Sequence, residues 1–202
     1  MNEAQKKFGE PVEIVRKKVF PEMNEMVQDF IRQAPFVVLA TANDAGDCDA
    51  SPKGGRPGFV RVIDKDHLVV PDIAGNNLFQ SYENLETNAK VGMLFLIPGC
   101  DWTVRVNGRV SVLDAQEGRL QGIAANVFDP DDNTRIQQGL LVEVDEALGH
   151  CPRAFTFSKL WDTESIDATS SLDPNRYWLG RWRDAMTETD APPLALPGDH
   201  LE

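Results

Sequence analysis

Residues 48–110 read CDASPKGGRPGFVRVIDKDHLVVPDIAGNNLFQSYENLETNAKVGMLFLIPGCDWTVRVNGRV, and this stretch decides the fold. Short runs of Val, Ile, Leu and Phe, which are typical of β-strands, alternate with loops rich in Gly, Pro, Asn, Lys and Arg. Strands at such close spacing, with few helices between them, are typical of antiparallel barrels. We therefore predict a mainly β fold with peripheral helices (α+β), built on an antiparallel barrel.

Two hairpins are predicted from apolar runs and the turn residues between them. The run 36–42 is followed by Asn, Asp and Gly and then by residues 48–51, which predicts the first hairpin. Residues 59–63 and 68–71 predict the second. The segment PKGGRPG at 52–58 holds two prolines and three glycines, so we expect no regular structure there.

The later strands are predicted from longer patterns. Residues 89–99 are strongly apolar, which indicates a central strand. In 103–114, Val alternates with Thr, Arg and Asn, which predicts one apolar and one polar face. We expect a single long strand with a bulge at Gly108 rather than a turn there. Residues 115–126 have a helical composition, and alternation resumes at 136–148.

A helix is predicted between Pro21 and Pro35, because apolar residues recur there at helical spacing. Its expected buried face carries Met23, Met26, Val27, Phe30 and Ile31. We expect a single domain over 1–202, made of a helical segment 1–35, a barrel core 36–145, a helical and aromatic segment 146–187 and a disordered tail 188–202. Trp161, Trp178 and Trp182 are expected to bury against the barrel or against a partner subunit.

The composition excludes several classes of partner. The formal net charge is −12 and the sequence pI is about 4.7, so we expect neither nucleic acid nor an anionic membrane as a partner. The N-terminus has no signal-peptide pattern and no segment has the length of a membrane span. Three widely spaced cysteines form no disulfide or zinc pattern, which favours a cytoplasmic location.

The first candidate for anion binding is the segment Ser-Pro-Lys-Gly-Gly at 51–55. The hydroxyl of Ser51, the cation of Lys53 and the flexible glycine backbone together could cradle a phosphate. The alternative is a glycine-rich hairpin loop that carries a solvated lysine.

The second candidate is a set of arginines on predicted strands. Arg61 stands in an otherwise apolar strand, and Arg105, Asn107 and Arg109 occupy alternate positions that share one face. Such a stripe could face an anion, or it could be the solvent side of an amphipathic strand. Arginine in so acidic a chain favours a ligand or an interface carboxylate.

The third candidate is the start of a helix predicted from residue 78 onward. Asp72, Asn76 and Asn77 lie between a strand and this helix, where main-chain N–H groups can bind an anion. The alternative is that the asparagines cap the helix. The spacing predicts an apolar face made of Leu78, Tyr82 and Leu85, with Ser81 and Asn84 off that face.

The sequence lacks the catalytic apparatus of common hydrolases. It holds no G-x-S-x-G and no H-E-x-x-H, and its three histidines form no triad or metal pattern. We predict no metal site. Anion-binding loops without acid–base residues favour a cofactor that brings its own chemistry.

Residues from about 36 to 114 resemble the pyridoxamine 5′-phosphate oxidase-related, FMN-binding split-barrel family. The resemblance is carried by FVVLATA, DASPKGGRPGFVRV, LVVPD, GNN, ENLETNAKVGMLFLIPG and TVRVNGRVSVLD, in that order. It implies a six-stranded antiparallel split β-barrel homodimer with two FMN sites between the subunits. Residues 150–161, HCPRAFTFSKLW, resemble an uncharacterised branch of this family. FVRVI stands where true pyridoxamine phosphate oxidases have a segment ending in Leu-Leu-Lys, so vitamin B6 oxidation is not implied.

The resemblance also implies roles for individual residues. The backbone of 58–63 would run along the flavin ring, which involves Phe59, Val60, Arg61 and Val62. The phosphate or ribityl chain would lie near the helix start and the glycine-rich loop, at Ser51, Lys53, Asn76, Asn77 and Ser81, and Asp72 is a further candidate for cofactor binding from its place before the helix. Residues of the other subunit would reach the cofactor or the interface, namely Arg105, Asn107 and Arg109. Residues 178–182 would cover the ring edge.

The resemblance implies a flavin-dependent oxidoreductase that acts on a small-molecule substrate or a nicotinamide donor. The charge or main-chain N–H of Arg61 would tune the ring. One alternative is a flavin carrier or sensor without turnover. Another is a split barrel that binds haem or a deazaflavin, although His67 and His150 are poorly placed to be axial ligands of haem.

Overall fold

The computed structural model describes residues 1–73, 75, 77–114 and 136–187. The chain divides into two compact units, Met1–Ser158 and Lys159–Glu202. The strands lie in the first unit and are β1 (Phe36–Ala42), β2 (Cys48–Gly54), β3 (Arg61–Val62), β4 (His67–Ile73), β5 (Lys90–Leu96), β6 (Thr103–Asp114) and β7 (Ile136–His150). The helices are α1 (Glu3–Phe8), α2 (Glu13–Arg16), α3 (Glu25–Gln33), α4 (Gln80–Thr87), α5 (Arg153–Ser158), α6 (Thr163–Thr169) and α7 (Pro174–Thr187).

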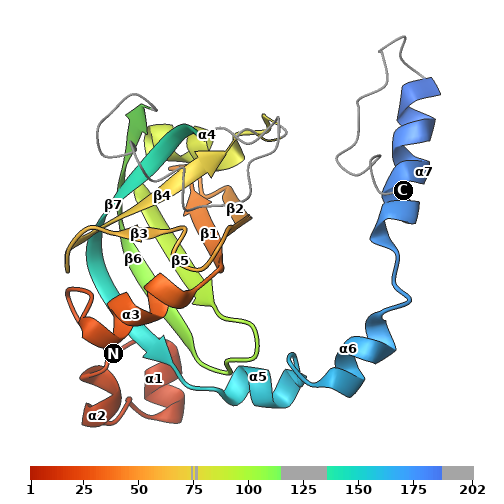
Figure 1. Ribbon diagram of the computed structural model, residues 1–202. Coiled ribbons are helices and arrows are strands. Elements are labelled where there is room, and N and C mark those ends of the chain that lie inside the picture. Colours follow the sequence, from red (N-terminus) through yellow and green to blue (C-terminus); the bar gives the residue numbers. More distant parts are fainter. Residues whose placement is uncertain (74, 76, 115–135, 188–202) are drawn as a thin grey trace. The chain divides into compact units, whose positions relative to one another are not determined.

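The strands form one antiparallel sheet in the order β2-β1-β5-β6-β7-β4-β3. It curls into an incomplete barrel with α4 at the upper end and α3 across the lower part, as Figure 1 shows. The mainly β split-barrel prediction is confirmed. Within the described residues the sheet has seven strands rather than the six expected, because the two-residue β3 pairs with β4 and forms an edge of the sheet.

The core fills the barrel with side chains that alternate along each strand. In β5, Val91, Met93 and Phe95 are buried, and the residues between them face outward. The predicted central position of this strand is confirmed, because β5 pairs with both β1 and β6. The inward positions of the other strands include Val37, Leu39, Leu68, Val70, Val104, Val106, Leu140 and Val142. Because successive residues point to opposite faces, the outward side chains of each strand are not needed for the core and can contact ligands or other chains.

The predicted helix before the barrel is confirmed as α3. The side chain of Asn24 accepts a hydrogen bond from the N–H of Val27 and so caps its start. Val27 and Ile31 are fully buried against the barrel. Met26 was expected on the same face, but its side chain is 52% exposed. Positions 26 and 27 differ by about 100° around the helix axis, so both cannot face the barrel equally.

The proline- and glycine-rich segment is more regular than predicted. β2 continues through Pro52 to Gly54, and Pro52 lies opposite Val38 of β1. β2 is an edge of the sheet and needs ladder hydrogen bonds on one side only. A proline is therefore tolerated, since it can turn its missing N–H toward the open side.

The predicted single long strand is confirmed, and the bulge lies opposite Gly108 on β7, where Asp145 is the extra residue. β6 is continuous over Thr103–Asp114, and its pairing with β7 shifts register between Asn107 and Gly108. A Cβ atom on Gly108 would lie 2.2 Å from the carbonyl oxygen of Glu143, so the close approach of the two strands requires glycine. The helix expected at 115–126 lies outside the described residues.

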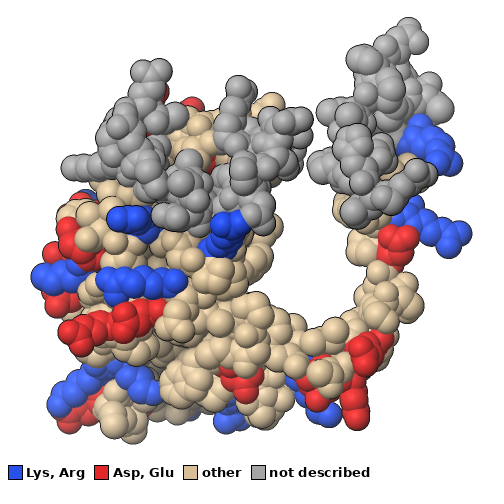
Figure 2. All heavy atoms as spheres, in the orientation of Figure 1, with Lys and Arg blue, Asp and Glu red and all other residues tan. Residues whose placement is uncertain are grey.

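Charged side chains of both signs lie next to one another on the N-terminal part of the surface, as Figure 2 shows. Arg16 pairs with Glu10, Arg32 pairs with Asp29 at 2.8 Å, and Lys65 pairs with Glu22. These exposed pairs contribute little to stability. Among the residues that the structure describes, no helix has the length and apolar character needed to cross a membrane.

The second unit holds α6 and α7. Asp162 caps α6 through a hydrogen bond from the N–H of Ser165. Trp178 on α7 is 52% exposed, and its expected burial against the barrel or a partner subunit stays a prediction. Its proposed role over the cofactor stays a prediction.

The bulge gives a prediction about stability. Replacing Gly108 with Ala would force a methyl group against the main chain of Glu143 and should lower the free energy of unfolding by roughly 3 kcal/mol. The control is Gly92→Ala on the neighbouring strand, where the new methyl would meet only the movable side chain of Asn107 at 3.4 Å. Urea unfolding of both variants is the measurement. Equal unfolding midpoints would contradict the role assigned to Gly108.

Candidate functional site

A small pocket lies between β2, β4 and the start of α4. Its volume is about 150 Å³. The residues that line it come from three separate stretches of sequence: Ser51, Lys53, Asp72, Ile73, Gly75, Asn77, Leu78, Phe79, Gln80, Ser81 and Tyr82. Five of them, Ser51, Lys53, Asp72, Asn77 and Ser81, are residues that the sequence predicts for cofactor binding. The structure therefore brings together most of the predicted phosphate-side residues.

An ion pair joins two strands that are distant in the sheet order. The Nζ of Lys53 on β2 lies 2.8 Å from the Oδ1 of Asp72 on β4. The Asp72 side chain is only 9% exposed and that of Lys53 is 26% exposed. Gln138, opposite Asp72 on β7, donates to the other carboxylate oxygen at 3.5 Å. The pair bridges the split in the barrel at a point where the main chain makes no ladder between β2 and β4.

Two hydroxyl groups at the pocket wall are held by a second carboxylate. Ser51 donates to Asp49 at 2.8 Å, and Ser81 donates to the same Oδ2 atom. The two hydroxyl oxygens are 3.2 Å apart. Because inward positions alternate along β2, Asp49, Ser51 and Lys53 all point to this end of the barrel.

The inner face of α4 is more polar than predicted. Ser81 and Asn84, which were expected off the packed face, are its buried residues. The amide of Asn84 donates to the hydroxyl of Thr41 at 3.0 Å. Tyr82 and Leu85 pack at the edge of the core, but Leu78 precedes the helix and is 60% exposed. The cause is that α4 covers an end of the barrel where strand ends present polar groups.

The start of α4 differs from the predicted asparagine cap. Phe79 occupies the capping position with a φ of 50°, and its phenyl side chain accepts no hydrogen bond from the first turn. Asn77 also has a positive φ, of 58°, and lines the pocket instead. Asn76 lies outside the described residues. Helix N–H groups without a side-chain cap attract acceptor oxygens, so the start of α4 favours an anion.

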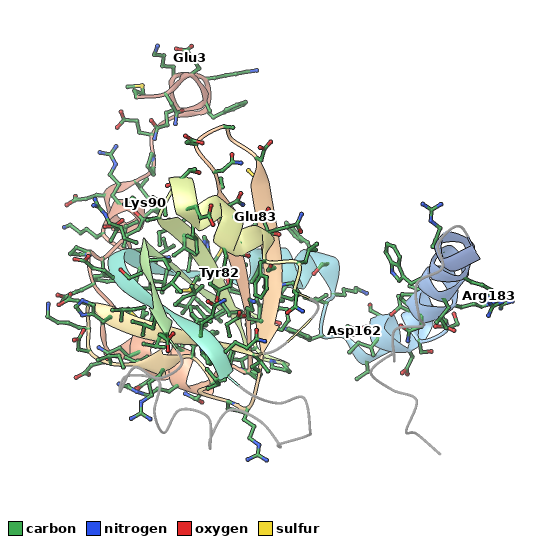
Figure 3. All side chains as sticks on the ribbon, turned by 90° about the horizontal axis from the view of Figure 1, so that it is seen from above. Glu3, Tyr82, Glu83, Lys90, Asp162 and Arg183 are labelled. Carbon is green, nitrogen blue, oxygen red and sulfur yellow. The ribbon has the colours of Figure 1, made fainter. Side chains whose placement is uncertain are left out.

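Tyr82 adds a buried hydroxyl to the pocket. Figure 3 places this residue over the middle of the barrel. Its hydroxyl oxygen is buried near the side chains of Asp72 and Gln138, but no described residue meets it in full hydrogen-bond geometry. Burial, and then the nearby charge of Asp72, raise the pKa of the Tyr82 phenol far above its usual value. The hydroxyl therefore stays protonated and can donate a hydrogen bond.

The predicted arginine stripe lies elsewhere, on the outer face of β6. The Nη2 of Arg105 lies 2.6 Å from the carboxylate of Glu146, and Asn107 donates to the same oxygen at 2.8 Å. The Nε of Arg109 lies 3.7 Å from Asp145. Both carboxylates belong to β7, so the stripe is neutralised within the chain. The Nε of Arg105 is buried without a hydrogen-bond partner among the described residues.

The outer face also carries a wide, open groove. Its volume is about 820 Å³, and it runs across β2, β1, β5, β6 and β7. Its lining includes Ala40, Ala50, Gly92, Asn107 and Glu146. The groove shares no lining residue with the small pocket.

The residues predicted to follow the flavin ring have different surroundings. The side chains of Phe59 and Val60 are buried in the core, at 2% and 1% exposure. Arg61 is exposed and Val62 is half-buried. None of these four residues lines the small pocket. Because the side chains of Phe59 and Val60 lie in the core, the predicted contact with the flavin ring depends on the main-chain groups of this segment and on the side chain of Arg61.

The sequence prediction assigns no site role to several polar residues found here, among them Asp49, Tyr82, Gln138 and Glu146. Alternation along β2 places Asp49 with Ser51 and Lys53, so that pattern could have found it. Glu146 depends on the Gly108 bulge, which sets it opposite Asn107.

The described histidines lie apart from both sites. His67 contacts Asp64 at 3.0 Å within a turn. His150 ends β7, where burial and then the charge of Arg105 lower its pKa. Neither residue lines the small pocket or the outer groove.

Several solved structures share similarity with this chain. HupZ from Group A Streptococcus is 17% identical, with 63% of this chain and 99% of that chain covered and a TM-score of 0.49. A putative pyridoxamine 5′-phosphate oxidase from Lactobacillus delbrueckii is 19% identical, with coverage of 64% and 95% and a TM-score of 0.47. An FMN-binding protein from Syntrophomonas wolfei is 17% identical, with coverage of 62% and 89% and a TM-score of 0.46.

No curated protein matches this sequence significantly. The sequence profile of the family described as pyridoxamine 5′-phosphate oxidase matches residues 23–142, which is more than half of the chain. The matched range contains α3, all of β1 to β6 and the first half of β7. The chain therefore belongs to the pyridoxamine 5′-phosphate oxidase family.

Proposed function

We propose that this protein is a flavin-dependent oxidoreductase that holds the phosphate or ribityl end of FMN in the small pocket at the start of α4. One observation carries the proposal: Ser51, Lys53, Asn77 and Ser81, from separate parts of the sequence, line the same pocket. Membership of the pyridoxamine 5′-phosphate oxidase family supports it.

The chemistry of the pocket suits such a group. Lys53 supplies a cation, Phe79 gives the first turn of α4 no side-chain cap, and the protonated hydroxyl of Tyr82 can donate a hydrogen bond. Acceptor oxygens of a phosphate would satisfy all three. A volume of about 150 Å³ is below the roughly 300–1,000 Å³ of pockets that enclose a whole drug-sized ligand, so the pocket would take the phosphate and not the three-ring system.

The flavin ring would then lie outside the pocket, along β3. This strand pairs with β4 on one side only, so its other edge offers main-chain N–H and C=O groups to a flat polar ring. Arg61, which is exposed on β3, would lie close to the ring and stabilise negative charge on it. When bound, flavin supplies a hydride acceptor, while the protein supplies position and electrostatics. The proposed reactant is a small molecule or a nicotinamide donor.

We also propose that two copies of the chain associate through the outer face of β2, β1 and β5. Ala50, Ala40 and Gly92 are cross-strand neighbours there, and their small side chains leave the floor of the groove flat. Phe36, on the same face of β1, is 37% exposed. An apolar patch rimmed by the charges of Lys90 and Asp145 is typical of an interface between subunits. In a homodimer, Arg105 and Arg109 beside the groove would approach the partner subunit.

The absorption spectrum of the freshly purified protein tests the function. We expect a flavin spectrum that bleaches under anaerobic NADH or NADPH, because a bound flavin with access to a donor accepts a hydride. A flavin spectrum that no donor bleaches would instead support a carrier or sensor. A haem-type Soret band, or protein that stays colourless after FMN is added, would contradict the proposal.

The pocket assignment predicts the effect of removing its cation. Lys53→Met should weaken FMN binding at least tenfold, about 1.4 kcal/mol, because Asp72 and Asp49 would then face the phosphate without compensation. Lys65→Met is the control, since Lys65 is exposed and pairs with Glu22 outside the pocket. Fluorescence titration measures both. If both variants bind FMN like the wild type, the pocket is not the phosphate site.

The proposed dimer predicts the effect of a charge in the groove. Ala40→Glu should raise the dimer dissociation constant about a hundredfold, because a two-fold interface contains the change twice at roughly 1.4 kcal/mol each. Gln33→Glu, exposed on α3, should leave the dimer intact. Sedimentation velocity over a range of concentrations is the measurement. A wild-type protein that sediments as a monomer would reject this interface.

A further inference from the structure

The charged side chains at the lining of the small pocket and directly behind it carry more negative than positive charge: Lys53 and Asp72 line the pocket, and Asp49 lies behind its hydroxyl groups. The carboxylate of Asp72 pairs with the ammonium of Lys53 at 2.8 Å. The carboxylate of Asp49 accepts hydrogen bonds from the hydroxyl groups of Ser51 and Ser81. Lys53 is the one cation that lines the pocket among the described residues. Two carboxylates against one ammonium leave one net negative charge beside the space that the ligand would enter.

This balance matters because the site is partly shielded from water. The side chain of Asp72 is 9% exposed and Ser81 is 4% exposed. Interactions between charges are stronger in such surroundings than in bulk solvent. A phosphate ester carries about −1.5 to −2 charges at neutral pH. Its attraction to Lys53 and to the start of α4 is therefore opposed by repulsion from Asp72 and Asp49.

We propose that Asp72 is the specificity-determining residue of this pocket and sets how much negative charge its ligand may carry. While its carboxylate holds Lys53, the terminal phosphate of a flavin contributes little to binding, and the pocket accepts the uncharged polyhydroxyl chain almost as well. This inference rests on the proposed function, because it takes a flavin as the ligand.

The geometry explains why Asp72 rather than Asp49 has this role. Asp72 lines the pocket and directly contacts the only lining cation among the described residues. Asp49 lies behind Ser51 and Ser81 and contacts their hydroxyl groups. Neutralising Asp72 frees the ammonium of Lys53 for a ligand. Neutralising Asp49 removes a more distant charge and frees two hydroxyl groups, so its effect should be smaller.

The test compares riboflavin with FMN, which differ by the phosphate alone. Fluorescence titrations on the full chain would measure both ligands with the wild type, Asp72→Asn and Asp49→Asn. We expect Asp72→Asn to bind FMN at least tenfold more tightly than the wild type while riboflavin affinity changes by less than about twofold. Asp49→Asn should shift the preference in the same direction but less.

A matched control distinguishes the effect of the Asp72 charge beside the pocket from the effect of the net charge of the whole chain. Asp29→Asn also adds one unit of charge to the chain, but Asp29 lies on α3 and pairs with Arg32. Its ratio of riboflavin to FMN dissociation constants should equal that of the wild type. A purely structural role of Asp72 would weaken both flavins together and leave this ratio unchanged, which would overturn the proposal.

A second readout keeps the two proposals distinguishable. If neither flavin binds the wild type or Asp72→Asn, the flavin proposal fails, and thermal unfolding with added inorganic phosphate then decides the charge proposal. Greater stabilisation by phosphate in Asp72→Asn than in the wild type and in Asp29→Asn would support it. Equal shifts in the unfolding temperature would reject it.

Discussion

The ion pair between Lys53 and Asp72 is the interaction on which the candidate site depends. β2 and β4 are far apart in the order of the sheet, and no ladder of main-chain hydrogen bonds joins them. The pair connects them through side chains and leaves room for a pocket where a closed barrel would have continuous pairing. Breaking such a largely buried pair leaves an uncompensated charge, which costs more than the pair itself contributes. The same contact therefore shapes the barrel and fixes the charge of its pocket.

A second constraint separates the two polar regions of the molecule. The bulge at Gly108 moves the pairing of β6 and β7 by one residue, which brings Glu146 opposite Asn107 and within reach of Arg105. The cations of β6 are thereby neutralised on the outer face. The pocket end of the barrel keeps its own charges, supplied by β2 and β4. Two sites of different chemistry thus lie on one sheet: a small polar pocket at its split and a broad, mostly apolar groove outside.

Most of the sheet could be predicted from the sequence, because alternation in β6 and the apolar run of β5 report directly which faces are buried. The continuity of β6 through Gly108 was predictable for the same reason, whereas the extra residue of the bulge lies on β7, where the burial pattern changes phase after Val144. The polar inner face of α4 was not predictable. Helical spacing assumes that the apolar face packs inward, whereas Ser81 and Asn84 meet polar groups of β1 and β2. The pairing of Lys53 with Asp72 depends on how far the sheet curls, and no local pattern encodes that.

Pro52 has a consequence for how molecules of this protein can meet. An unpaired edge strand is a template on which a strand from another chain can add, and this is a route to aggregation. β2 is such an edge, and it carries a proline, which cannot donate a ladder hydrogen bond, together with Lys53. At the opposite edge, β3 is only two residues long. Both margins of the sheet thus discourage open-ended strand addition, which favours the finite, closed association of two copies that we propose for the outer face.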